Sequence, residues 1–235
     1  VIGREFDYNL LARVKPGRGS DLDDALMRLV DSELVFSRGQ PPEARYVFKH
    51  ALVQDTAYAS LLRGRRQELH GRIVDALETH FPERAAVEPG VLAYHCAQAG
   101  RVNQSVAYTL TASDVAMAHA NYEEGIAQLE SGLDTLKALS EGTERASLEL
   151  ELQVALSWTV RLRKGPAYPR NETVLQRALK LCDEVGGPTH RSQILFGLSL
   201  MHIWRGDLER ALDEAKRLMA IAEDGSDRNQ MIIGL

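Results

Sequence analysis

Apolar side chains recur every three or four positions in residues 7–14 and again in residues 20–33, and this spacing predicts two amphipathic helices. The pattern then changes to short runs of β-branched and aromatic residues at 34–37 and 45–49, which predict two strands. A proline-containing loop at 39–44 separates the strands, so we expect them to form a hairpin. Two helices followed by a β-hairpin indicate a winged helix-turn-helix.

From His50 onward the pattern predicts helices with short connections. The breaks between the helices fall at glycine, proline and asparagine residues, which end helices. Antiparallel helices joined by short loops are the expected arrangement. The predicted helices are residues 51–62, 65–80, 91–99, 103–119, 123–139, 144–162, 174–184, 193–204 and 208–223.

Two stretches of the helical part, residues 122–133 and 206–218, match the second half of a tetratricopeptide repeat. In the first stretch, Gly125 and Gly132 place small residues where two helices must approach closely. Residues 100–106 form a weaker third copy, and the copies do not recur at a constant period. We therefore expect a degenerate array of helical hairpins, in which stacking supplies the stability that a single hairpin lacks.

Charge divides the chain near Pro82. Residues 1–81 contain 12 Lys or Arg and 12 Asp or Glu, so the net charge of −5 lies wholly in residues 82–235. We expect a winged-helix-like domain with a linking helix in residues 1–81 and a tetratricopeptide-like array in residues 82–235. The predicted fold class is mainly α: a winged-helix domain with a small β-hairpin, followed by a tetratricopeptide-like α–α superhelix.

The composition, 44% hydrophobic and 26% charged, is typical of a globular protein. The acidic net charge disfavours a generally basic nucleic-acid binder, and no apolar run approaches the ~18 residues that a membrane helix needs. Cys96 and Cys182 form neither a CxxC pair nor a disulfide framework, which predicts a reducing, cytoplasmic compartment. Because the chain starts at Val1 and residues 231–235 are apolar, we expect it to be a piece of a longer protein.

The sequence contains no motif that carries catalytic chemistry. It has no GxSxG nucleophile turn, no HExxH zinc motif, no GxGxxG fingerprint and no GxxxxGK phosphate loop. Its seven histidines are scattered, and neither cysteine is accompanied by a pair of metal ligands. We therefore predict no catalytic residue and no metal ligand in this chain, and we assign any catalysis to a neighbouring part of the parent protein.

Nucleic-acid binding is an alternative that the charges disfavour. The predicted recognition helix, residues 20–33, carries five carboxylates against Arg28 alone, and such a surface repels a phosphate backbone. The densest basic patch consists of Arg63, Arg65, Arg66 and Arg72, with His70 among them. It is either a surface that meets phosphate, from nucleic acid or from a nucleotide on an adjacent domain, or a solvated helix face paired with Glu68 and Asp75.

Residues 45–58, with the sequence RYVFKHALVQDTAY, form a recognisable pattern together with VIGREF at 1–6 and RQELH at 66–70. These segments resemble the region that follows the ATPase core in STAND-type signalling ATPases. The resemblance is particularly to bacterial proteins in which a nucleotide-cyclase domain precedes an AAA-like ATPase and a tetratricopeptide tail. It is specific in residues 1–81 and diffuse in the helical array.

The resemblance implies a role for His50. In related STAND proteins, a His-Asp pair at the end of the winged-helix hairpin supplies a sensor histidine that approaches the β-phosphate of bound ADP. His50 occupies that place, and Ala51 stands where the family has Asp. His50 also follows a predicted strand and opens a predicted helix, where backbone N–H groups favour an anion. The alternative is a histidine that caps this junction without a ligand.

Three hypotheses for the function follow. The first, implied by the resemblance, is a regulatory fragment of a multidomain signalling ATPase whose parent includes a nucleotide cyclase. In it, an upstream nucleotide-binding domain holds ADP or ATP, and the helical array receives a protein or small-molecule effector. The second is a tetratricopeptide-like scaffold that binds a partner peptide, and the third is a winged-helix transcription regulator. We expect no cofactor within this chain and no membrane partner.

Overall fold

The computed structural model describes residues 1–15, 19–186 and 188–223. This part of the chain is mainly helical and contains one small antiparallel sheet, in agreement with the predicted class. It separates into two compact units, Val1–Ser105 and Val106–Leu235. The predicted domain boundary near Pro82 stays a prediction, and the apolar residues 231–235 lie outside the described residues.

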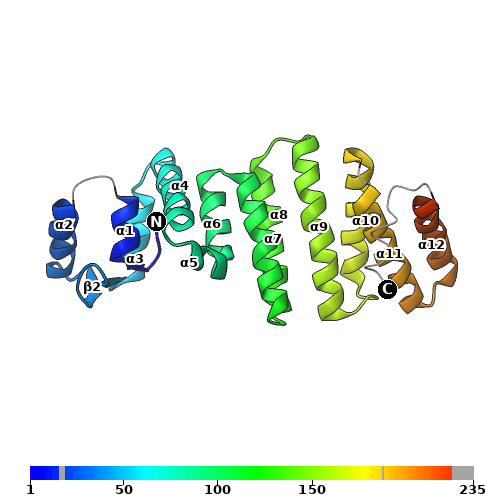
Figure 1. Cartoon of the computed structure of the whole chain (residues 1–235), viewed down its shortest axis with the longest axis horizontal. Helices are drawn as coiled ribbons and strands as arrows, with labels where there is room; N and C mark the ends of the chain where they lie inside the picture. Colours follow the sequence, from blue (N-terminus) through cyan, green and yellow to red (C-terminus); the bar gives the residue numbers. More distant parts are fainter. Residues whose placement is uncertain (16–18, 187, 224–235) are drawn as a thin grey trace. The chain divides into compact units, whose positions relative to one another are not determined.

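The first unit contains the sheet and a set of short and medium helices (Figure 1). Its elements are β1 (Glu5–Asp7), α1 (Tyr8–Val14), α2 (Gly19–Asp31), β2 (Val35–Arg38), β3 (Arg45–Phe48), α3 (Ala51–Ala59), α4 (Arg63–His80), α5 (Pro82–Val87) and α6 (Pro89–Ala99). The unit ends within α7 (Val102–Ala118).

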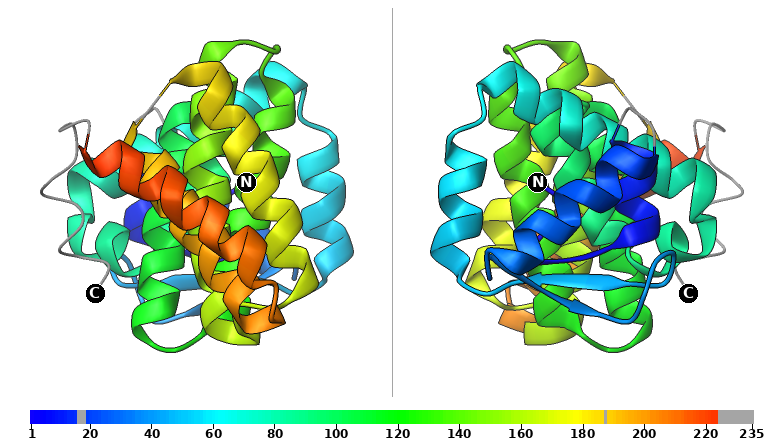
Figure 2. Two further views of the ribbon diagram at one scale, coloured as in Figure 1. Left: turned by 90° about the vertical axis from the view of Figure 1, so that its right-hand side faces the viewer. Right: turned by 90° about the vertical axis from the view of Figure 1, so that its left-hand side faces the viewer.

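The sheet has the strand order β1-β3-β2, so β3 pairs with a strand on each side. The β2–β3 hairpin confirms the hairpin that the sequence predicts, and Figure 2 shows it beside α2. The third strand, β1, was not predicted; it places Phe6 opposite Tyr46, and their rings stack with centroids 5.6 Å apart. The core beneath the sheet unites strands and helices; its buried residues are Phe6, Leu22, Leu26, Val35, Ala44 and Tyr46.

A second core in the first unit lies where α4 contacts α6, with α5 packed against both. The buried apolar residues of α4 and α6 are Ile73, Val74, Ala76, Leu77, Leu92, Ala93 and Cys96. The prolines that open α5 and α6, Pro82 and Pro89, occupy first-turn positions where a missing N–H costs nothing. Because α4 precedes Pro82 and α5 and α6 follow it, this core includes residues from both sides of Pro82.

The second unit is built from helices that contact their neighbours in chain order. After the rest of α7, its elements are α8 (Tyr122–Thr135), the short 3₁₀ helix η1 (Leu136–Ala138), α9 (Thr143–Lys164), α10 (Pro169–Val185), α11 (Pro188–Arg205) and α12 (Leu208–Glu223). Helix α9 contacts α8, α10 and α11, while α11 contacts α9, α10 and α12. Antiparallel neighbouring helices joined by short loops agree with the sequence pattern.

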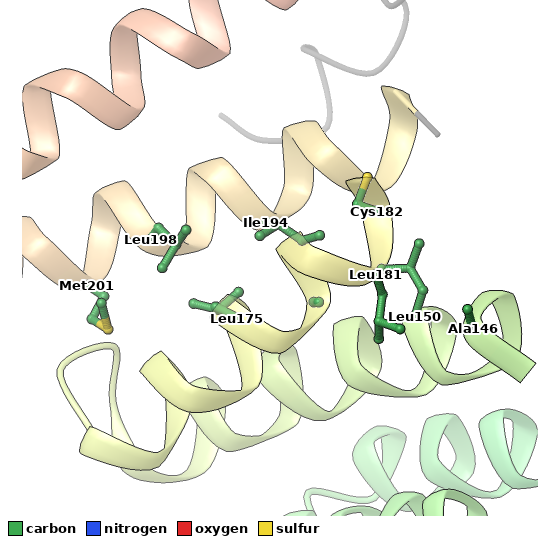
Figure 3. Close-up of a cluster of buried hydrophobic side chains, with 9 residues drawn as sticks. Ala146, Leu150, Leu175, Leu181, Cys182, Ile194, Leu198 and Met201 are labelled. Atoms are coloured by element: carbon green, nitrogen blue, oxygen red, sulfur yellow. The ribbon is translucent and has the colours of Figure 1, made fainter. Parts of the chain in front are cut away.

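The core of the second unit lies between α9, α10 and α11. Figure 3 shows side chains from these three helices pointing toward one another. The buried residues of this core are Ala146, Leu150, Leu175, Ala178, Leu181, Cys182, Ile194, Leu198 and Met201. Because the residues come from three successive helices, no single helical hairpin of this region contains a complete core.

The predicted close approach of helices at Gly125 and Gly132 is confirmed. A Cβ atom added at Gly132 would lie 2.8 Å from Cγ2 of Thr109 and 3.2 Å from Cδ2 of Leu152. At Gly125 the nearest atom, Oγ of Ser113, would be 3.3 Å away. Helix α8 thus packs against neighbouring helices through positions that have no side chain.

Several helix boundaries differ from the predicted ones; helix α11, for example, begins at Pro188 instead of residue 193. Helix α10 begins at Pro169 instead of residue 174, because proline fits the first turn of a helix. The break between α3 and α4 falls at residues 60–62, and Gly64 lies inside α4 with no atom within 4 Å of a Cβ added there. A helical glycine is tolerated at such an exposed position at a cost of about 1 kcal/mol.

Candidate functional site

His50 lies between β3 and α3, at the strand–helix junction where the sequence placed it. Its backbone is extended, with φ −129° and ψ 134°, and its carbonyl oxygen accepts a hydrogen bond of 3.1 Å from the N–H of Val53. The imidazole is exposed and makes no capping hydrogen bond to the helix. His50 therefore marks the start of α3 with its backbone, while its side chain is presented to the exterior of the unit.

The helix that follows His50 has few contacts within the unit. Helix α3 contains no buried residue; it packs against β3, and its Tyr58 contacts His70 of α4. Leu52 in its first turn is 77% exposed, and Leu62 just beyond its end is 82% exposed. The first N–H groups of a helix have no intrahelical partner. The junction thus combines an imidazole, helix N–H groups and the exposed side chain of Leu52.

A chain of three polar side chains connects α3 to the second core of the unit. The hydroxyl oxygen of Tyr58 lies 3.1 Å from Nε2 of His70, and Nδ1 of His70 lies 2.7 Å from Nδ1 of His95. Tyr58 belongs to α3, His70 to α4 and His95 to α6. His70 is fully buried and His95 is 3% exposed. This Tyr–His–His chain is a contact through which α3 is attached to the helices behind it.

The short distance between two Nδ1 atoms requires one of them to donate a hydrogen and the other to accept it. This geometry leaves at least one of the two rings neutral, and the tautomer of His70 determines whether its Nε2 accepts from Tyr58 or donates to it. Burial lowers the pKa of His70 to about 4, and burial together with the neighbouring His70 lowers the pKa of His95 to about 3. Desolvation acts in this direction because it penalises the charged imidazolium.

The structure corrects the view of His70 as part of the basic patch. Its side chain is buried, whereas Arg65 and Arg72 lie outside and both pair with Glu68, at 2.6 and 2.5 Å. Asp75, which the sequence suggested as a partner of the patch, pairs with Arg101 instead, at 2.6 Å. For Arg65 and Arg72 the arrangement favours the solvated, paired helix face over a phosphate site.

Sequence reasoning missed the histidine pair, although a signal was present. His70 shares a helical stripe with Ile73, Val74 and Leu77, at the spacing that places residues on one face. The apolar neighbours at that spacing indicate that His70 points into the core. Of the two other arginines of the patch, Arg66 stacks on the ring of Tyr58, with its Cζ 5.2 Å from the ring centroid.

The acidic residues of α2 and of the turn that follows it are all exposed; they are Asp21, Asp23, Asp24, Asp31 and Glu33. Two of them have partners: the hydroxyl of Tyr8 donates to Asp23 at 2.7 Å, and Lys49 pairs with Glu33 at 2.5 Å. The exposed face of α2 is therefore rich in carboxylates, which is the wrong sign for contact with a phosphate backbone.

The cysteines give a prediction that is independent of any ligand. Cys96 and Cys182 are buried and form no disulfide, and desolvation raises the pKa of Cys96 to about 12 and also raises that of Cys182. Because the thiolate is the reactive form, we expect the native chain at about pH 8 to react with a disulfide reagent such as Ellman's reagent at least about tenfold more slowly than the urea-unfolded chain. Rapid labelling of either thiol under native conditions would contradict this.

Within residues 1–15, 19–186 and 188–223, no group of three or more His, Cys, Asp or Glu side chains is placed to hold a metal ion. In the same ranges, no helix combines the length and the apolar character needed to cross a membrane.

Comparison with known proteins gives one informative similarity. No family model matches the chain, and no solved structure matches it. The chain is 30% identical, over 183 residues, to an uncharacterized protein of Rhizobium meliloti (strain 1021). The matched region is 76% of this chain and 18% of that protein, so the chain spans less than a fifth of the relative's length.

Proposed function

We propose that the chain is a regulatory part of a bacterial, STAND-type signalling ATPase. In this proposal residues 1–81 form a winged-helix-like domain that contacts an upstream nucleotide-binding domain in its ADP-bound state. Residues 82–235 form a tetratricopeptide-like array that receives a protein or small-molecule effector. ATP hydrolysis, and cyclic-nucleotide synthesis where the parent includes a cyclase, belong to other domains of the parent, which we place in the cytoplasm.

The observation that carries the proposal is the state of His50. An exposed imidazole without a hydrogen-bond partner on its own helix, at a helix N-terminus, is suited to meet an anion held by another domain. An imidazole N–H supplies a directional donor, and the helix N–H groups add a favourable partial charge. The exposed Leu52, two residues after His50, supplies apolar surface for a domain contact beside it.

The topology of the first unit supports the winged-helix assignment. Helices α1 and α2 are followed by the β2–β3 hairpin, and β1 joins the hairpin through β3 to give the order β1-β3-β2. A helix pair with a three-stranded antiparallel sheet, in which the strand before the helices pairs with the last strand, is the arrangement of winged-helix domains. The exposed carboxylates of α2 favour a protein-contacting role over DNA binding.

Two features support the repeat assignment for the second unit. Its helices pack on their successors in chain order, and α9 also reaches α11 across α10. The glycines of α8 lie at close helix contacts, where the repeat pattern requires small residues. The length of the relative, of which the chain spans 18%, is in keeping with a multidomain parent.

The test is the rate at which ADP leaves the parent protein. A fluorescent ADP analogue is bound to the protein expressed from the complete reading frame, and its release is followed after addition of excess ATP. His50→Ala is expected to speed release several-fold, because the donor to the phosphate is lost. Ala51→Asp, which restores the family's His-Asp pair, is expected to slow it.

His80→Ala is the matched control, since His80 is an exposed histidine at the end of α4 and its variant should release ADP at the unchanged rate. Equal release rates for the native protein and the His50 variant would remove His50 from the mechanism. A complete reading frame without a phosphate loop would overturn the proposal as a whole.

A further inference from the structure

Helices α9 and α11 expose large apolar side chains on adjoining faces. Trp158 is 49% exposed and Leu162 48% exposed on α9, and Phe196 is 38% exposed on α11. Single exposed apolar residues are normal on a protein surface. These three belong together, because α9 contacts α11 and because Trp158 and Phe196 both flank the same arginine, Arg161. We call the four residues the α9–α11 surface.

Arg161 is the centre of this surface. Its Cζ lies 4.1 Å from the ring centroid of Trp158 and 5.6 Å from that of Phe196. Within the described residues it forms no ion pair with a carboxylate, and burial lowers its pKa. Nearby arginines differ: Arg163 pairs with Glu123 at 2.9 Å, and Arg205 pairs with Glu172 at 2.5 Å. A partly buried cation without a counter-ion is costly, and an external carboxylate would relieve that cost.

The charges around Arg161 favour an acidic ligand. The last turn of α9 contains Arg161, Arg163 and Lys164, and the carboxylate of Glu123 pairs with the latter two together. The described ion pairs thus leave a local surplus of positive charge at this end of α9. Leu162 and Arg163 also line a shallow hollow with the α7–α8 turn, and this hollow extends the surface beyond Arg161.

We propose that the α9–α11 surface binds an acidic segment of a partner protein. A carboxylate of the segment pairs with the guanidinium of Arg161, and an adjacent apolar side chain covers Trp158 and Phe196. Tryptophan and arginine are the side chains that contribute most at protein interfaces, and a guanidinium held by an aromatic ring is preorganised for a carboxylate. This inference deepens the proposed function and rests on it in one respect, namely that the helical array receives an effector.

The test uses Trp158 as the reporter. The chain has two tryptophans, so Trp204→Phe leaves Trp158 as the single tryptophan, which is excited selectively at wavelengths where tyrosine does not absorb. This chain is titrated with a pool of short peptides composed of Glu, Leu and Phe, and in parallel with a pool in which Gln replaces every Glu. We expect a saturable change in fluorescence with the acidic pool and about tenfold weaker binding of the Gln pool, the loss of one charge-assisted contact.

Arg161→Gln is expected to weaken binding of the acidic pool about tenfold, and Arg161→Lys to weaken it less, since lysine keeps the charge but not the planar fork. Arg210→Gln is the control, because Arg210 is an exposed arginine on α12 that pairs with Asp207. Circular dichroism verifies that each variant is folded. The two peptide pools are also compared on the chain that retains Arg161, and this comparison needs no arginine variant.

Equal affinity for both pools, or no saturable change with the acidic pool, would overturn the inference. A fluorescence change that depends on protein concentration alone would assign the surface to a second copy of the chain and would also overturn it. Release of ADP from the parent protein involves none of these residues. Failure of the peptide test and failure of the proposed function are therefore separate results.

Discussion

Lowering the pH from about 7 to about 5 is expected to reduce the free energy of unfolding of the first unit by about 2 kcal/mol for each of His70 and His95. Their pKa values in the folded chain, about 4 and about 3, lie below the ordinary value of histidine. An effect of this size is a large part of the stability of a small unit.

The sign follows from the proton count of each state. Above pH ~6.5 both histidines are neutral in the folded and in the unfolded chain, and stability is fully present. Between pH ~6.5 and the lowered pKa values, the unfolded chain binds protons that the folded chain excludes, so stability falls as the pH falls. The cationic groups that act on the pair, Arg84 and the α-amino group of Val1, oppose protonation in the same direction.

The measurement is urea unfolding followed by circular dichroism at several pH values between about 7 and about 5, above the range in which most carboxylates take up protons. Both tryptophans, Trp158 and Trp204, lie in the second unit, so the fluorescence transition is an internal control with a weaker pH dependence. His95→Gln should remove about half of the pH dependence, while His80→Gln, at an exposed position, should preserve it. A stability of the first unit that is independent of pH across this range would show that the pair is not held neutral.

Gly132→Ala is expected to lower the free energy of unfolding of the second unit by about 2 kcal/mol. The added Cβ would lie 2.8 Å from Cγ2 of Thr109 and 3.2 Å from Cδ2 of Leu152, so α8 must shift or Thr109 must leave its position. Thr109 is β-branched and has few alternative rotamers in a helix. The better helix propensity of alanine, about 1 kcal/mol, offsets only part of the strain.

Urea unfolding followed by tryptophan fluorescence measures this effect. Gly125→Ala, on the same helix, meets its nearest atoms at 3.3 and 3.4 Å and should change stability much less. Gly64→Ala is the opposite control, because its Cβ meets nothing within 4 Å and the circular dichroism transition should move to higher urea. Thr109→Ser removes the clashing methyl and should recover part of the loss in a double variant. A neutral Gly132→Ala would show that α8 is not closely packed there.

The long helices of the fold can be predicted from periodicity alone, because apolar residues that recur every three or four positions over several turns fit only a helix. Helix α12 begins at the predicted residue, and the β2–β3 hairpin lies within one residue of its predicted position. Strand β1 was missed because three residues hold no period; it exists through its pairing with β3. Helix α5 is similarly too short for a pattern. The start of α10 was missed because Pro169 was interpreted as part of a loop, whereas proline also opens helices.

Local sequence likewise predicts one part of the candidate site, while the other part depends on how the helices pack. The position of His50 follows from local sequence, since a strand run ends and a helix begins on either side of it. The contact of His70 with His95 joins residues from two helices, and only the packing of α4 on α6 brings them together. Likewise, Arg161 and Trp158 are neighbours on one helix, but the contribution of Phe196 depends on the approach of α11 to α9.

Helix α3 contains no buried residue, and this affects the free energy needed to open it. An element that contributes little buried area can be displaced, rotated or unwound without exposing a core, and such elements open most readily under native conditions. The contact of the Tyr58 hydroxyl with His70 is one interaction that opposes such opening. Local opening of α3 is therefore expected to require less free energy than unfolding of the two cores of the unit.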